Sequence, residues 1–196
     1  MLMREAKLER RTLETEISAR LRLDGGGEAA ADTGIGFFDH MLTAWCRFAL
    51  FDLELKARGD LAVDAHHTVE DCGIVLGRLL ADALGEKKGV RRVAGALLPM
   101  DEALAQVAVD FSGRGFLAWN VPPLTGTAGA FPCELAEEFF RALAVNAGAT
   151  LHITLQAGRN RHHILESIFK GTGLAMGEAA ALDPRVRGVF STKGVL

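Results

Sequence analysis

Apolar residues occupy most odd-numbered positions between residues 12 and 23, and polar residues occupy most of the even-numbered ones. A period of two over this length predicts a half-buried strand. It ends at the Asp-Gly-Gly-Gly sequence at 24–27, which is a strong turn signal. Apolar residues then recur at helical spacing along 37–51 and along 66–85, so two helices are predicted.

The second half of the chain repeats this plan. The predicted strands are 53–55 and 61–63 in the first half, and 103–110, 116–121 and 150–155 in the second. Helices are predicted at 133–147 and 162–181, and the Gly-, Pro- and Thr-rich stretch 122–132 is predicted to be an exposed connection. The order strand, strand, helix, strand, helix therefore occurs twice.

Residue identities support a duplication. The sequence HHTVE at 66–70 recurs as HHILE at 162–166, and the same offset of 96 places Leu55 on Leu151 and Gly77 on Gly173. We therefore expect an α+β fold made of two copied half-domains, 1–95 and 96–196, in one compact domain. Each half has a β-sheet with helices packed on it, and the halves pack sheet to sheet or helix to helix about a pseudo-twofold axis.

Composition excludes several classes of protein. Of 196 residues, 49% are hydrophobic and 24% charged, with a formal net charge of −3, which excludes a disordered chain and argues against nucleic-acid binding. Three scattered cysteines do not form a disulfide framework. The first residues lack the apolar stretch of a secretory signal, and no run approaches the ~20 apolar residues that span a membrane. We expect a cytoplasmic protein that binds no membrane.

The histidines carry the candidate chemistry. Five of the six lie at three places, which are His40, the pair His66 and His67, and the pair His162 and His163. Each pair begins an HHxxE motif that ends at Glu70 or Glu166. A single pair at a helix start is more often a surface or capping feature. Two identical motifs at a constant offset favour a metal site instead.

Helical spacing fixes part of the metal geometry. His66 and Glu70 are four residues apart, so they lie about 40° apart around a helix and can chelate one ion. His67 projects about 100° from His66, which suits a neighbouring metal, but it is also three residues from Glu70. Spacing therefore leaves open which histidine shares that carboxylate. Imidazole and carboxylate ligands are compatible with Mn, Fe, Co, Ni or Zn.

Four cations form a second candidate set. Arg92, Arg114, Lys170 and Lys193 are each ordinary solvated charges when taken singly, but together they can bind a phosphate. Glu14 lies within the predicted first strand, where carboxylates are disfavoured, and His152 is expected to be a structural or surface residue of its strand.

The motifs GFFDHML, DAHHTVEDCG, GRNRHHILESIFK and the terminal STKGVL resemble the imidazoleglycerol-phosphate dehydratase family, and the resemblance covers essentially the whole chain from RRTLET onward. It implies a duplicated α+β fold and a homo-oligomer, a 24-mer with active sites between subunits around two Mn2+ ions. It also implies a hydro-lyase of histidine biosynthesis that converts D-erythro-imidazoleglycerol phosphate to imidazole acetol phosphate and water.

The resemblance also implies roles for particular residues. One metal would be held by His40, His67, His162 and Glu166, and the other by His66, Glu70, His163 and Glu138. Family members commonly have a histidine immediately before the Phe-Phe pair where this chain has Glu138, although a carboxylate can still bind a hard cation. The residues implied to bind the substrate phosphate are Arg92, Arg114, Lys170, Ser191 and Lys193, and Glu14 is implied to transfer a proton.

Two other functions compete. A dinuclear metal-dependent phosphoester hydrolase would use two ions to activate water, but such sites usually contain several aspartates, and only Asp39, Asp64 and Asp71 lie near these histidines. A metal-assembled structural protein would explain the histidines and carboxylates but not the separate set of arginines and lysines.

Overall fold

The alternating segment forms strand β2 (Thr15–Arg22), whose odd-numbered side chains are buried and whose even-numbered ones face outward. The computed structural model describes residues 4–196; residues 1–3, which the predicted first half includes, lie outside the described residues. Strand β2 belongs to a four-stranded sheet in the order β1-β2-β4-β3. Its other strands are β1 (Glu5–Arg11), β3 (Ala29–Asp32) and β4 (Asp52–Gly59).

A second sheet has the same topology. Its order is β5-β6-β10-β7, with two antiparallel pairings followed by one parallel pairing, as in the first sheet. The strands are β5 (Val93–Met100), β6 (Ala103–Asp110), β7 (Phe116–Asn120) and β10 (Thr150–Ala157). The short strands β8 (Thr127–Ala128) and β9 (Phe131–Pro132) pair within the connection that follows β7. The matching orders make β1 and β5, β2 and β6, β4 and β10, and β3 and β7 structural counterparts.

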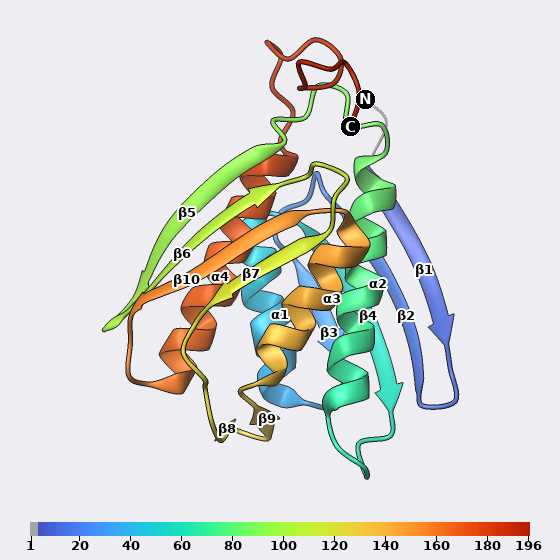
Figure 1. The fold of residues 1–196 in the computed structure, drawn as a ribbon. Helices are drawn as coiled ribbons and strands as arrows, with labels where there is room; N and C mark the ends of the chain where they lie inside the picture. Colours follow the sequence, from blue (N-terminus) through green and yellow to red (C-terminus); the bar gives the residue numbers. More distant parts are fainter. Residues whose placement is uncertain (1–3) are drawn as a thin grey trace.

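Four helices lie between the two sheets (Figure 1). They are α1 (Gly36–Ala49), α2 (His66–Leu84), α3 (Leu135–Ala147) and α4 (Arg161–Ala180). Helix α1 packs on α4 and α2 packs on α3, so the two copies meet helix to helix. The α+β fold with two helix-backed sheets is confirmed. The division into 1–95 and 96–196 stays a prediction, and β5 begins at Val93.

Glycines let the paired helices approach closely. A Cβ atom added at Gly77 of α2 would lie 2.6 Å from the carbonyl oxygen of Leu143 on α3. A Cβ atom at Gly173 of α4 would collide with the carbonyl oxygen of Trp45 on α1. Gly77 and Gly173 are the pair related by the offset of 96, so the repeat preserves a packing requirement of both helix pairs.

Three strands of the four-stranded sheets, together with the short β8 and β9, are absent from the sequence-based prediction, and one predicted strand is wrong. The unpredicted strands β1, β3 and β5 all lie at sheet edges. Edge strands tolerate charges, short length, glycine and proline, so their sequences show no clear alternation of apolar and polar residues. The three sequences are EAKLERR, AAAD and VAGALLPM. The predicted strand 61–63 is instead a turn, in which the Val63 N–H donates to the Asp60 carbonyl oxygen at 2.7 Å.

The three cysteines form no disulfide framework, as the sequence predicts. Cys46, Cys72 and Cys133 are buried free thiols, so no disulfide forms among them. Within residues 4–196, no helix is long and apolar enough to cross a membrane.

Candidate metal centre and phosphate pocket

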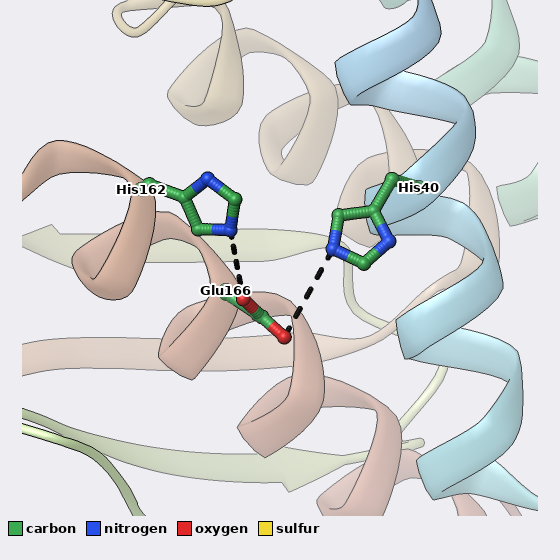
Figure 2. A group of neighbouring side chains, drawn as sticks. All are labelled: His40, His162 and Glu166. Carbon is green, nitrogen blue, oxygen red and sulfur yellow. Dashed lines mark hydrogen bonds and ion pairs between the residues drawn. The ribbon is translucent and has the colours of Figure 1, made fainter.

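Helices α1 and α4 bring two histidines and a glutamate together near their N-terminal ends (Figure 2). His40 comes from α1, and His162 and Glu166 are one turn apart on α4. One possible ligand atom from each residue lies within 4.8 Å of the others. Ligands about 2.0–2.2 Å from one ion lie about 3 to 4.4 Å apart, so a small closing movement fits this donor set to a divalent metal. Among the described residues, this is the one such group of three.

The carboxylate of Glu166 is the buried member of this group. Its Oε2 atom lies 3.0 Å from Nε2 of His162, and its Oε1 atom lies 4.0 Å from Nε2 of His40. Lys170, one turn further along α4, places Nζ 2.7 Å from Oε1. Burial opposes ionisation of Glu166, but the contacts with Lys170 and His162 outweigh it and hold the pKa of Glu166 below its ordinary value. The group therefore presents an ionised carboxylate.

Aromatic packing restricts the two imidazoles. The ring of Phe37 lies 5.1 Å from that of His162, measured between centroids, in an edge-on arrangement, and 6.4 Å from that of His40. The two histidine rings are 5.9 Å apart. Both imidazoles remain about half exposed, so a ligand from solvent or from a second chain can reach them.

The remaining predicted ligands are not drawn into this group. His66 and Glu70 of α2 lie 3.9 Å apart through Nε2 and Oε2, as their spacing predicts. The carboxylate of Glu138 lies 3.8 Å from Nε of Arg141, one turn along α3. Within one chain, the structure thus brings together three members of the first predicted ligand set and separates His67 from them. The full ligand assignment stays a prediction.

His67 and His163, the second histidine of each pair, are held by carboxylates. Nδ1 of His67 lies 3.0 Å from Oδ2 of Asp60, and Nδ1 of His163 lies 2.7 Å from Oε2 of Glu102. These hydrogen bonds raise the pKa of both imidazoles against the effect of burial. The bond to His163 and the N–H groups of Asn160 and Arg159 lower the pKa of Glu102 to about 2.

Sequence reasoning missed both of these carboxylates. Asp60 lies between the predicted strands 53–55 and 61–63, where no functional residue is predicted, and Glu102 lies at the tip of a hairpin whose first strand, β5, is not predicted. The sequence offset of 96 carries Glu14 onto Asp110, so the signal for Glu102 is the matching strand order of the two sheets and not the repeat in the sequence. Glu14 and Glu102 occupy the corresponding hairpins β1–β2 and β5–β6, so a role for one directs attention to the other.

Glu14 lies at the turn between β1 and β2, not within a strand as the alternation predicted. The side chain of Thr12 accepts hydrogen bonds from the N–H groups of Glu14 and Thr15, which fixes the turn. The Glu14 carboxylate is 54% exposed and lies 3.9 Å from Nδ1 of His67. It is therefore an exposed carboxylate close to a candidate metal ligand.

The predicted phosphate residues divide into two places. Arg92, Arg114, Ser191 and Lys193 line one open pocket of about 740 Å³ beside the C-terminal tail. Arg92 also donates to both oxygens of Asp110, at 2.6 and 2.8 Å, and to the Phe190 carbonyl oxygen. Among the described residues, Arg114 and Lys193 have no carboxylate partner within ion-pair distance. Lys170 lies elsewhere, against Glu166 and over the ring of Phe48.

The C-terminal tail, which lines the pocket, lies at one end of α4 (Figure 1), and the metal group lies at the other end, in the first turns of this helix. The backbone N–H of Arg92 donates to the carbonyl oxygen of Ala179 in the last turn of this helix, whereas His162 is in its first turn. A helix of 20 residues is about 30 Å long. A small phosphorylated molecule cannot span that distance, so one chain cannot offer both surfaces to the same molecule.

The fold and the site together define a class of protein: an α+β fold of two similar halves with a candidate metal centre of histidines and a buried carboxylate at its helix N-termini. The family model for imidazoleglycerol-phosphate dehydratase matches residues 33–176. The chain is 61% identical to the imidazoleglycerol-phosphate dehydratase of Desulfitobacterium hafniense and 55% identical to that of Desulforudis audaxviator, each match covering 100% of both chains.

Two solved structures are similar throughout. The imidazoleglycerol-phosphate dehydratase of Staphylococcus aureus matches with a TM-score of 0.83 and 38% identity, covering 91% of this chain and 99% of the other. The Pyrococcus furiosus protein, solved with the ligand (S)-C348, gives the same TM-score and identity over 96% and 100%. The chain belongs to the imidazoleglycerol-phosphate dehydratase family, and it is an enzyme.

Proposed function

We propose that this enzyme uses two bound Mn2+ ions to dehydrate D-erythro-imidazoleglycerol phosphate to imidazole acetol phosphate in histidine biosynthesis. We also propose that it works in the cytoplasm. The observation that carries the proposal is the group formed by His40, His162 and Glu166 on a scaffold of this family. The relatives named above support the substrate and the reaction.

The chemical difficulty is the proton to be removed, which lies on a carbon beside an imidazole ring with no carbonyl group to acidify it. A metal bound by the histidines would supply Lewis-acid stabilisation to that ring. Glu14 takes the proton, because it is the exposed carboxylate beside His67. Arg114 and Lys193 hold the phosphate and so fix the position of the reacting carbon.

Two chains are needed to build this site. His67 of a second chain completes the ligand set of His40, His162 and Glu166, and His163 of a second chain completes that of His66, Glu70 and Glu138. The separation of the phosphate pocket from the metal group along α4 supports this arrangement. We infer a homo-oligomer, a 24-mer, with its active sites between subunits.

One assay separates the possible functions. The Mn2+-loaded enzyme is incubated with imidazoleglycerol phosphate, and formation of the ketone and release of inorganic phosphate are both followed. Ketone without phosphate supports the dehydratase. Phosphate release would favour the phosphoester hydrolase, and formation of neither product would contradict the proposed reaction.

A further inference from the structure

The two hairpins that begin the repeats carry one glutamate each, and the two glutamates make different contacts. Glu14 lies in the β1–β2 turn and Glu102 in the β5–β6 turn, which correspond because the two sheets have the same strand order. Each hairpin turn approaches the N-terminal end of the HHxxE helix of its own repeat. Glu14 faces His67 of α2, and Glu102 faces His163 of α4.

Glu102 is fully engaged. Its Oε2 atom lies 2.7 Å from Nδ1 of His163, and its Oε1 atom accepts hydrogen bonds from the N–H groups of Arg159 and Asn160 at 3.1 and 2.7 Å. Both oxygens therefore act as acceptors. Because an ionised carboxylate only accepts hydrogen bonds, this contact favours a proton on Nδ1 of His163.

Glu14 makes no such bond. Its carboxylate stays 3.9 Å from Nδ1 of His67, because Asp60 lies closer to that nitrogen, with its two oxygens at 3.0 and 3.2 Å. Asp60 follows β4, so this carboxylate comes from a different element than Glu102. The backbone N–H of Asp60 also donates to the Glu14 carbonyl oxygen at 3.1 Å, which ties the two turns together.

A histidine that donates from Nδ1 presents the lone pair of Nε2, the form that binds metal. For His163, the Nε2 atom lies 3.6 Å from Oδ2 of Asp101, beyond hydrogen-bond distance, so it remains available. The two repeats thus reach the same tautomer by different means. The second repeat uses its hairpin glutamate, whereas the first uses Asp60.

We propose that Glu102 and Asp60 are positioning residues that hold His163 and His67 with Nε2 directed to metal, and that Asp60 thereby releases the hairpin glutamate Glu14 for proton transfer. The part that concerns Glu14 rests on the proposed function. After duplication, equivalent glutamates have thus taken different roles, one in metal binding and one in chemistry.

Glu102→Gln is the decisive variant. Its amide keeps the size of the side chain and one accepting oxygen, which remains with the Asn160 and Arg159 N–H groups. Its NH2 group then faces Nδ1 of His163 and forces the imidazole proton to Nε2, where it blocks metal binding. If Glu102 merely caps the loop at 159–160, this substitution is harmless and only Glu102→Ala is damaging.

The measurements are Mn2+ titration of the intact oligomer and nitrogen-15 chemical shifts of labelled histidines in the metal-free protein. We expect Glu102→Gln to weaken Mn2+ binding about 10- to 100-fold at half of the sites and to move the His163 proton to Nε2, with an unchanged melting temperature. Asp60→Ala should weaken Mn2+ binding by a similar factor at the other half of the sites, which contain His67. Glu14→Gln should leave Mn2+ affinity unchanged while turnover falls, and Glu9→Gln, an exposed carboxylate on β1, should change neither.

The outcomes are separable. Normal Mn2+ affinity and an Nδ1 proton in Glu102→Gln would overturn the role of Glu102, and normal affinity in Asp60→Ala would overturn that of Asp60. Weakened Mn2+ binding in Glu14→Gln would overturn the divergence of the two glutamates. Because the titration uses the metal alone, its result is independent of whether the enzyme dehydrates imidazoleglycerol phosphate.

Discussion

Oε2 of Glu166 lies 3.0 Å from Nε2 of His162, one turn earlier on α4, and the carboxylate is buried while the imidazole is half exposed. The carboxylate is held from the other side by Lys170, so its position does not depend on a metal. Glu166 is therefore the fixed member of the group.

Replacement of Glu166 by glutamine should remove the negative charge of the group. The neutral amide cannot balance a divalent cation, and its NH2 group would also face either Lys170 or His162. We expect Mn2+ affinity to fall at least about tenfold, as for loss of one interaction with a charged group. Calorimetric titration measures this change. Glu54→Gln, which removes an exposed carboxylate paired with Arg20 on the first sheet, is the matched control and should bind Mn2+ normally.

Sites shared between chains predict complementation. Co-expressed His67→Ala and His162→Ala chains should form mixed oligomers in which about a quarter of the affected sites combine an intact His67 with an intact His162. Activity should therefore return, although each variant alone is inactive. Co-expressed His40→Ala and His162→Ala should stay inactive, because those two residues lie in one chain's group. If the first pair also stays inactive in verified mixed oligomers, the shared site is wrong.

Substitutions in the phosphate pocket should have two different effects: some weaken substrate binding alone, and one also lowers thermal stability. Arg114 and Lys193 have no carboxylate partner among the described residues, so their replacement by alanine should raise KM about 10- to 100-fold with little change in melting temperature. Arg92 bridges Asp110 and the Phe190 carbonyl oxygen, so Arg92→Ala should also lower the melting temperature. Steady-state kinetics and thermal unfolding of all three variants test this contrast.

The sequence predicts those features of the site that depend on residues close together along the chain. The HHxxE motifs fixed His66 and Glu70 at one helical turn, because helix geometry determines that spacing. The meeting of His40 with Glu166 depends on how α1 packs against α4, which spacing along the chain does not encode; it was reached through the resemblance. The roles of Asp60 and Glu102 are not predicted, because each lies in a turn that is brought to its histidine by the strands on either side.

The same distinction explains the fold. Central strands such as β2 have one buried face and therefore alternate, whereas the edge strands β1, β3 and β5 are freer in sequence and were missed. The pairing of Gly77 with Gly173 was visible as an identity in the repeat. Its cause, backbone contact between helices, required the structure.

The stability of the fold should depend on pH through Asp183, a carboxylate of the C-terminal tail that lies 4.0 Å from Nε of Arg91, outside the tail. Arg185 donates to both oxygens of this carboxylate, at 2.9 and 2.6 Å, and holds the pKa of Asp183 well below its ordinary value of 3.8. A carboxyl group with a lowered folded-state pKa stabilises the fold fully above its ordinary value and loses that contribution as the pH falls through the lowered one. The melting temperature of Asp183→Asn should thus lie below that of the wild type at pH 7.

This difference should narrow as the pH falls below 3.8, because the carboxyl of the unfolded wild-type chain then binds a proton, which the folded state, with its lowered pKa, resists. Thermal unfolding of both proteins between pH 7 and pH 3 gives the comparison. A difference that stays constant across this range would show that the charge of Asp183 does not stabilise the fold.

The close approach of the helices predicts an unusual response to alanine. In an open helical position, glycine to alanine stabilises by about 1 kcal/mol, because alanine restricts the unfolded chain and favours the helix. Gly36, in the first turn of α1, has no atom within 4 Å of an added Cβ, so Gly36→Ala should show no loss of stability. Gly173→Ala should instead destabilise by about 1–3 kcal/mol, because its Cβ meets the backbone of Trp45, which no side-chain rotation can relieve.

Gly77→Ala should behave like Gly173→Ala, since its Cβ meets the backbone of Leu143 on the other helix pair. Denaturant unfolding of the metal-free variants measures all three free energies. Because α1 carries His40 and α4 carries Glu166, Gly173→Ala should also weaken Mn2+ binding at that group by widening the gap between the helices. Gly77→Ala should affect the same group much less, because α3 carries none of its ligands and α2 contributes only His67, from a second chain. Equal effects of the two variants on this group would mean that helix separation does not set its geometry.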